Sequence, residues 1–178
     1  MSKGKKVLSA LLASAILIGG ASAYASSNPE KLAAFNQATI SALQAVQAAT
    51  AKVAGKATEV DFNFKNGSSY YKVDVVQDNQ GNGEKHEIVV DAKTGEILAD
   101  NVKTKHHKKD KVRPEAKVTL EQAMDIATQQ AGGKIKDVEL DREHNSLRYE
   151  VESIKDGKTY KTVIDANSGN VIHSGIDY

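Results

Sequence analysis

Two stretches of the chain follow the same pattern, and that pattern decides the fold. Residues 149–172 read Tyr-Glu-Val-Glu-Ser-Ile-Lys-Asp-Gly-Lys-Thr-Tyr-Lys-Thr-Val-Ile-Asp-Ala-Asn-Ser-Gly-Asn-Val-Ile. Residues 71–98 begin with Tyr-Lys-Val-Asp-Val-Val, continue through a turn-rich insert, and end with His-Glu-Ile-Val-Val-Asp-Ala-Lys-Thr-Gly-Glu-Ile-Leu. Both stretches alternate apolar and polar residues between turns that contain glycine, which is typical of strands with one buried face. The chain therefore contains one structural unit twice.

The correspondence between the two copies continues upstream into a helix. When Tyr71 is aligned with Tyr149, the capping-box residues Ser41 and Gln44 match Thr119 and Gln122, and apolar residues at helical spacing follow in both copies. We call this correspondence the repeat alignment. We therefore predict an α+β fold of two tandem units, each with one helix packed on a small antiparallel β-sheet. Because such short units bury little surface alone, we expect the copies to pack on each other, or on a partner, through part of their sheets.

Residues 1–25 have the features of a secretory signal peptide. Lysines precede a short apolar run at residues 7–18, and Ala23-Tyr24-Ala25 ends the segment. The run is shorter than the roughly 20 residues that span a membrane, so we expect cleavage after Ala25, or alternatively after Ala23, rather than a retained anchor. The mature protein would be periplasmic or secreted, with no transmembrane segment.

The remaining chain divides at a charged segment. We predict a first copy with an N-terminal helical extension at residues 26–98, a basic linker at 99–117 and a second copy at 118–178. Removal of the basic residues 1–25 leaves the mature chain slightly acidic, because the whole chain has 24 Lys and Arg against 23 Asp and Glu. That balance argues against a nucleic-acid partner. The chain has no cysteine, so neither disulfides nor a thiolate metal site are expected.

The same motifs resemble a known family. A capped helix that ends in glycine, then Tyr-Glu-Val at 149–151 and Val-Ile-Asp-Ala-Asn-Ser-Gly-Asn-Val-Ile at 163–172, resemble the PepSY domain, which is named for peptidase propeptides and a spore-germination protein. The resemblance is strong from Val118 to Ile172 and weaker from Ile40 to Leu98. It implies a helix on an antiparallel sheet, and an inhibitory or chaperone-like role toward peptidases.

The shared Asp-Ala-x-Thr/Ser-Gly signature predicts a turn rather than a catalytic site. It places Asp91 before Gly95 and Asp165 before Gly169. An aspartate at the start of a turn accepts backbone amides, and the glycine supplies positive φ. No nucleophile, base and orienting group recur together in the sequence, so we expect a protein that is not an enzyme and that needs no cofactor.

Two functional hypotheses follow. In the first, an exported, non-enzymatic protein binds or restrains a protein partner such as a secreted peptidase, and the strand around Thr159 to Ile164 adds a partner strand. In the second, an envelope-associated module binds a metal ion or a polyanion through the linker, where His106 and His107 are the candidate ligands among lysines. Adjacent histidines lack the spaced third ligand of metal sites, so a solvated linker is favoured there. The oligomeric state stays open.

Overall fold

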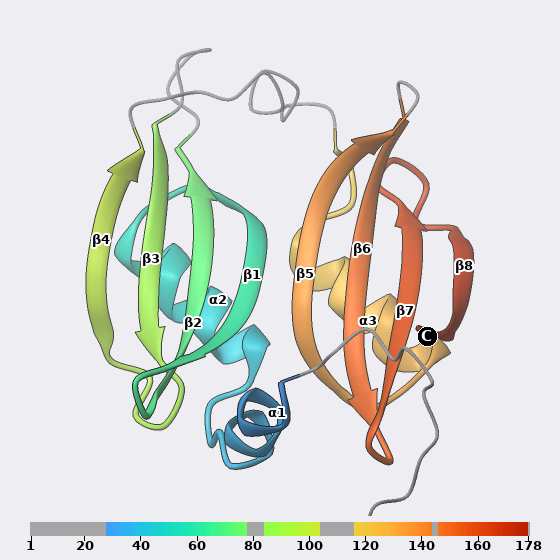
Figure 1. Cartoon of the computed structure of the whole chain (residues 1–178). Coiled ribbons are helices and arrows are strands. Elements are labelled where there is room, and N and C mark those ends of the chain that lie inside the picture. Colours follow the sequence, from blue (N-terminus) through green and yellow to red (C-terminus); the bar gives the residue numbers. More distant parts are fainter. Residues whose placement is uncertain (1–27, 78–83, 104–115, 144–145, 178) are drawn as a thin grey trace, which may run out of the picture.

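The computed structural model describes residues 28–77, 84–103, 116–143 and 146–177, and in this part the chain forms one sheet with helices on one face (Figure 1). The helices are α1 (Pro29–Asn36), α2 (Ala42–Lys52) and α3 (Leu120–Gln130). The strands are β1 (Lys56–Lys65), β2 (Ser68–Val76), β3 (Lys85–Asp91), β4 (Ile97–Lys103), β5 (Lys134–Glu143), β6 (Ser146–Lys155), β7 (Lys158–Asp165) and β8 (Val171–Ile176). The sheet is antiparallel throughout, with the strand order β4-β3-β2-β1-β5-β6-β7-β8.

The prediction of two units with separate small sheets is wrong. Strands β1 and β5 pair antiparallel, with Val60 opposite Val138, and join the strands of both copies into one eight-stranded sheet among the described residues. Each of these strands would otherwise be the open edge of a four-stranded sheet, with unpaired amides and carbonyls. Pairing removes both edges at once. The narrower expectation, that the copies pack through part of their sheets, is confirmed.

The join between the copies has an internal twofold relation. Val138 is the counterpart of Val60 in the repeat alignment, so two equivalent residues face each other at the centre of the β1–β5 pairing. An antiparallel pair centred on equivalent residues is the arrangement that a symmetric dimer uses, in which the same patch of both partners meets itself. We call this contact, made by β1 and β5, the joint.

Local signals in the sequence start the helices as predicted. Ser41 and Gln44 form the capping box of α2, and Thr119 and Gln122 form that of α3. The side chain of Asn28 caps α1 by accepting from the Glu30 amide. These contacts satisfy backbone amides that have no partner inside the helix.

Buried tyrosines and close-packed glycines fix each helix on the sheet. The Tyr71 hydroxyl donates to the Ile40 carbonyl at 3.1 Å, just before α2, and the Tyr149 hydroxyl donates to the Val118 carbonyl at 2.9 Å, just before α3. After each helix, a glycine lies against the end of a strand: a Cβ on Gly133 would lie 2.6 Å from a carbonyl oxygen of β6. A side chain at that position would force the backbones apart.

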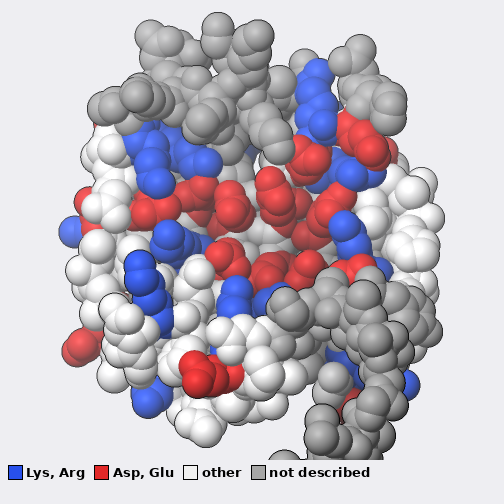
Figure 2. Space-filling view, in the orientation of Figure 1, with Lys and Arg blue, Asp and Glu red and all other residues white. Residues whose placement is uncertain are grey.

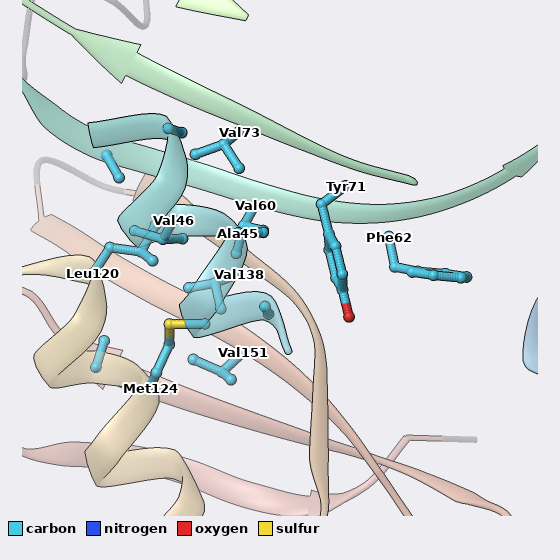
Figure 3. Packing of buried hydrophobic residues seen from close by; sticks show 14 of the residues in the cluster. Ala45, Val46, Val60, Phe62, Tyr71, Val73, Leu120, Met124, Val138 and Val151 are labelled. Atoms are coloured by element: carbon cyan, nitrogen blue, oxygen red, sulfur yellow. The ribbon is translucent and has the colours of Figure 1, made fainter. Parts of the chain in front are cut away.

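The core is continuous across the joint. Leu120 and Met124 of α3 lie with Val46 of α2 over Val138 of β5 (Figure 3). At the other end of the joint, Phe35 of α1 packs edge-to-face on Phe62, with ring centroids 5.1 Å apart. Apolar burial therefore joins the two copies beneath the sheet as well as through it.

The structure also bears on the predicted boundaries. Strand β4 continues to Lys103, so residues 99–103, which are predicted as the start of the linker, pair with β3. The predicted signal peptide and residues 104–115 of the predicted linker, which include His106 and His107, lie outside the described residues. Among the helices that the structure describes, none is long and apolar enough to cross a membrane.

Candidate functional site

The helix-free face of the sheet carries the charged side chains of the strands (Figure 2). Side chains alternate along a strand, so the residues between the core valines point to this face. Its acidic members include Glu59, Asp61, Asp74, Glu87, Asp137, Glu139, Glu150 and Glu152, and its basic members include Lys72, Lys85, Lys103, Lys136, Arg148 and Lys161. Acidic residues gather over the middle of the sheet, with lysine and arginine around them.

Four carboxylates of this face meet at the joint. Glu59 lies opposite Glu139, and Asp61 lies opposite Asp137. We call these residues the joint carboxylates. Like charges directly opposite each other on paired strands are destabilising, so this arrangement needs either protons or cations to hold it. The Nζ of Lys31 from α1 lies 3.5 Å from Asp61 Oδ1 and supplies one cation.

Asp137 is the most constrained of the four. Its Oδ1 accepts the Phe62 backbone amide across the joint at 3.0 Å, and its Oδ2 lies 2.7 Å from Lys136 Nζ. Burial, together with a hydrogen bond to Asp61, raises the pKa of Asp137 to about 7 in spite of Lys136. Burial opposes ionisation of Asp61 too, but the hydrogen bond from Asp137 and the charge of Lys31 hold the pKa of Asp61 below its ordinary value. The two carboxyls therefore hold a proton between them.

A second carboxyl pair lies beside the joint. Burial raises the pKa of Glu59 to about 7, and the charge of Asp74 and a hydrogen bond to it add to the rise. The charge of Lys85 opposes this rise, and that of Glu139 adds to it. Lys85 also forms an ion pair with Asp74. Each strand of the joint therefore carries one carboxyl whose pKa is raised to about 7, Glu59 on β1 and Asp137 on β5.

Farther from the joint, the carboxylates are paired with cations. Glu152 contacts Lys136 at 2.5 Å, and Glu150 contacts Lys161 at 2.5 Å and Arg148 at 2.6 Å. On the other side, Glu87 accepts from Lys103 at 2.8 Å. Acidic residues also lie opposite the joint carboxylates on the neighbouring strands, Asp74 on β2 and Glu150 and Glu152 on β6, but these have lysine or arginine partners. Within the described residues, no group of three or more histidine and carboxylate side chains is placed to hold a metal ion.

The turn signature lies away from the joint. Asp91 Oδ1 accepts the amides of Lys93 and Thr94, both at 2.8 Å, and these bonds hold the pKa of Asp91 below its ordinary value. Asp165 Oδ1 accepts the amide of Ser168 at 2.7 Å and that of Asn167 at 3.0 Å in the second copy.

The glycines of these turns, Gly95 and Gly169, have φ values of 79° and 76°. The structure thus places the four signature residues in two separate turns and does not bring them together. His106 and His107 lie outside the described residues.

The open edges of the sheet differ from the predicted one. Strand β7, which contains Thr159 to Ile164, pairs with β6 on one side and β8 on the other. The predicted contact strand is therefore internal, and strand addition there is ruled out. The edges are β4 and β8.

All the exposed large apolar side chains of the described residues lie on these two edge strands. They are Leu98 (54% exposed) and Val102 (48%) on β4, and Val171 (37%) and Ile172 (61%) on β8. Leu98 and Ile172 correspond when Asp91 is aligned with Asp165, and each occupies a β-bulge. Both copies thus keep an exposed apolar residue at the same place beside an unpaired edge.

A histidine–carboxylate pair was not predicted from the sequence. His86 Nδ1 lies 2.7 Å from Asp100 Oδ1, between β3 and β4. The two residues are 14 positions apart on neighbouring strands, so only the strand register reveals the contact. No nucleophilic side chain is hydrogen-bonded to this pair in the part of the chain that the structure describes.

Comparison with known proteins places this fold in a family. The family model described as "Peptidase propeptide and YPEB domain", or PepSY, matches residues 39–101 and 117–173. The chain belongs to the PepSY family. Both copies are therefore PepSY repeats, and the resemblance seen in the sequence is confirmed.

Individual proteins are similar to the chain over most of its length. The chain is 30% identical over 177 residues to a Bacillus subtilis (strain 168) protein, YkoJ, which is described as uncharacterized, and the match covers 97% of this chain and 98% of YkoJ. A solved structure from Clostridium difficile 630, described as a candidate lipoprotein, is 21% identical with a TM-score of 0.45. That match covers 78% of this chain and 94% of the other.

Proposed function

We propose that this protein is an exported, non-enzymatic binding protein that engages an extended segment of a protein partner at the β4 edge of its sheet. The proposal rests on one observation: strand β4 has both an unpaired backbone edge and exposed apolar side chains. Leu98 and Val102 are the exposed large apolar residues of β4, and β4 pairs on one side only. An extended peptide that adds to an edge gains main-chain hydrogen bonds and places alternate side chains in contact with its neighbours.

The geometry of β4 suits a partner strand. The bulge lies at the start of the strand, opposite the step from Val89 to Val90 on β3, and pairing from residue 99 to 103 is regular. Bulges at edges deter pairing between copies of a protein. The regular part of β4 therefore offers a short edge, which fits a single added segment better than extended aggregation.

A secreted peptidase is the partner class that the family favours. The description of the family names peptidase propeptides. The sequence begins with the features of a signal peptide. We infer that the protein acts outside the cytoplasm and restrains or assists a peptidase that it meets there. The choice of a peptidase rests on the family, and the mode of binding rests on the β4 edge.

The test uses the mature protein, residues 26–178, immobilised and exposed to the native extracytoplasmic fraction. We expect it to retain a peptidase and to change the rate at which that peptidase cleaves fluorogenic casein. Replacement of both apolar residues by lysine (Leu98→Lys with Val102→Lys) should abolish retention, because charged side chains block strand addition at an edge.

The matched control is Ile172→Lys on the equivalent edge, β8, which should leave retention unchanged. Thermal unfolding of each variant checks that the sheet is intact. If retention persists in the β4 variant and is lost in the β8 variant, the binding edge is β8. If it persists in both, strand addition is not the mode of binding.

A further inference from the structure

The contact between the repeats depends on very little backbone. Three residue pairs join β1 to β5, whereas the pairing of β1 with β2 runs the full length of both strands. The ladder is extended by a side chain, since Asp137 Oδ1 accepts the Phe62 amide. Amides two residues apart on a strand point to the same neighbour, so the Val60 amide also faces β5. Asp137 therefore contributes a side-chain bond to a joint that has few backbone pairs.

The side chains beside this short ladder are acidic in both repeats. In the repeat alignment, Glu59 corresponds to Asp137 and Asp61 corresponds to Glu139. Because the pairing is centred on equivalent valines, these positions face each other across the joint. Two independent copies of the same acidic pair thus meet, and full ionisation would place four negative charges around one pair of strands.

We propose that the joint is a proton-responsive contact between the two PepSY repeats, in which a proton shared by Asp61 and Asp137 bonds β1 to β5 and a proton on Glu59 relieves its repulsion with Glu139. Loss of these protons as the medium passes from mildly acidic to mildly alkaline pH sets like charges against each other and weakens the pairing. The core beneath the sheet persists, because Val46, Leu120 and Met124 pack there without ionisable groups. The response is therefore a loosening of the sheet at the joint.

Charged groups on every packed element surround the joint carboxylates. On β2, Lys72 lies opposite Asp61 and Asp74 lies opposite Glu59. On β3, Glu87 lies opposite Asp74, and the charge of Lys85 acts on Glu59. Lys103 on β4 interacts with Asp74 and Glu59 through its charge. The remaining groups are Lys31 on α1, Lys136 on β5, Glu150, Glu152 and Arg148 on β6, and Lys161 on β7. Several of these cations are held by other carboxylates: Lys103 by Glu87, Lys161 by Glu150 and Lys136 in part by Glu152. They reduce the repulsion at the joint and do not remove it.

The direction of the effect follows from proton linkage. Burial and the neighbouring carboxyls raise the pKa of both Glu59 and Asp137 to about 7, whereas the ordinary values are 4.5 and 3.8. Between those limits the folded protein binds protons that the unfolded or opened state has released. Stability of the joint is therefore fully present at low pH and falls as pH rises through about 7.

The decisive measurement is amide hydrogen exchange by NMR on the mature protein between mildly acidic and mildly alkaline pH, corrected for intrinsic exchange. We expect protection of Val60 and Val138 at the joint to fall about tenfold or more relative to Val73, an internal amide of β2. The double variant Glu59→Gln with Asp137→Asn should remove this difference. The Gln and Asn side chains can still donate a hydrogen bond, as a protonated carboxyl does, but they cannot ionise. Exposed control changes, Glu96→Gln and Asp125→Asn, should retain it.

Carboxyl carbon-13 titration of the unmodified protein supplies an independent reading, should the double variant fail to fold. We expect at least two carboxyls of the joint to titrate near neutral pH. The proposal would be overturned if every carboxyl of the joint titrated at an ordinary acidic pH. It would also be overturned if the exchange protection of Val60 and Val138 changed in parallel with that of Val73 at every pH. This response is separate from partner binding at β4, so failure of one leaves the other standing.

Discussion

Lys134 links the helix that precedes the first repeat to the first strand of the second, and its removal should release that link. Its Nζ donates to the carbonyls of Phe35 and Ala38, each at 2.8 Å, where α1 ends. The same Nζ lies 4.6 Å from the centroid of the Phe35 ring. Lysine near a helix C-terminus also meets the negative end of the helix dipole. Lys134→Met keeps an apolar stem of similar length and deletes both hydrogen bonds, the cation–π contact and the interaction with the helix dipole.

The expected cost follows from those contacts. A hydrogen bond to a charged donor contributes about 1.5–3 kcal/mol when well buried. Burial lowers the pKa of Lys134, but the group is only partly buried, so about 1 kcal/mol for each bond is appropriate. The cation–π contact adds about 0.5–1 kcal/mol at a partly exposed site. The rotamer entropy that Lys134 loses on folding offsets part of this gain, so the net loss on its removal should be roughly 2 kcal/mol.

Repeat symmetry provides the control. Lys56 is the counterpart of Lys134 in the repeat alignment, and it is exposed at the start of β1. Lys56→Met should change the free energy of unfolding by less than about 0.5 kcal/mol. Urea denaturation measures both variants, and hydrogen exchange at the Leu32 amide, which donates to the Asn28 carbonyl at the start of α1, reports whether the helix detaches. Equal losses in the two variants, or an unchanged α1 in Lys134→Met, would refute the role of Lys134 in holding α1.

Three further outcomes are expected. Tyr71→Phe and Tyr149→Phe should each cost about 1 kcal/mol in denaturant unfolding, since each removes one hydroxyl-to-carbonyl bond in equivalent positions. Gly133→Ala should lower the melting temperature markedly, with a loss of about 2 kcal/mol or more, because its φ is 86° and a Cβ would lie 2.6 Å from a carbonyl oxygen. Global stability should fall from mildly acidic to neutral pH, and Asp137→Asn should reduce that slope by up to about 1 kcal/mol per pH unit, as measured by urea unfolding at constant ionic strength.

Local structure could be predicted because its signals are local. A capping box needs two residues three positions apart, and both Ser41 with Gln44 and Thr119 with Gln122 form one in the structure. Alternation of apolar and polar residues identified which side chains face the core, as at Tyr71. Such signals establish strands and their buried faces without the identity of the neighbouring strand.

The joint could not be predicted from those signals. The alternation in residues 56–65 and 134–143 is satisfied equally by two separate sheets and by one merged sheet, because merging changes the edge contacts and leaves each face unchanged. Alternation does not specify the order of strands either. For this reason the prediction of β7 as a contact edge is wrong. A usable signal did exist: Val60 and Val138, which correspond in the repeat alignment, are both flanked by acidic residues on each side.

The twofold relation explains why the acidic edge residues of one repeat meet those of the other at the joint. On the edge of an isolated repeat, carboxylates such as Glu59 and Asp61 would face water and would deter pairing with other strands. In the joined sheet each faces an acidic residue of the other repeat, so a feature that protects a single edge becomes a repulsive element inside the contact. Pairing then requires protons, Lys31, or the packing of α1. Because α1 precedes the first repeat and has no counterpart before α3 in the part of the chain that the structure describes, it breaks the symmetry, and the contacts of Lys31 and Phe35 with β1 have no equivalent in the second repeat.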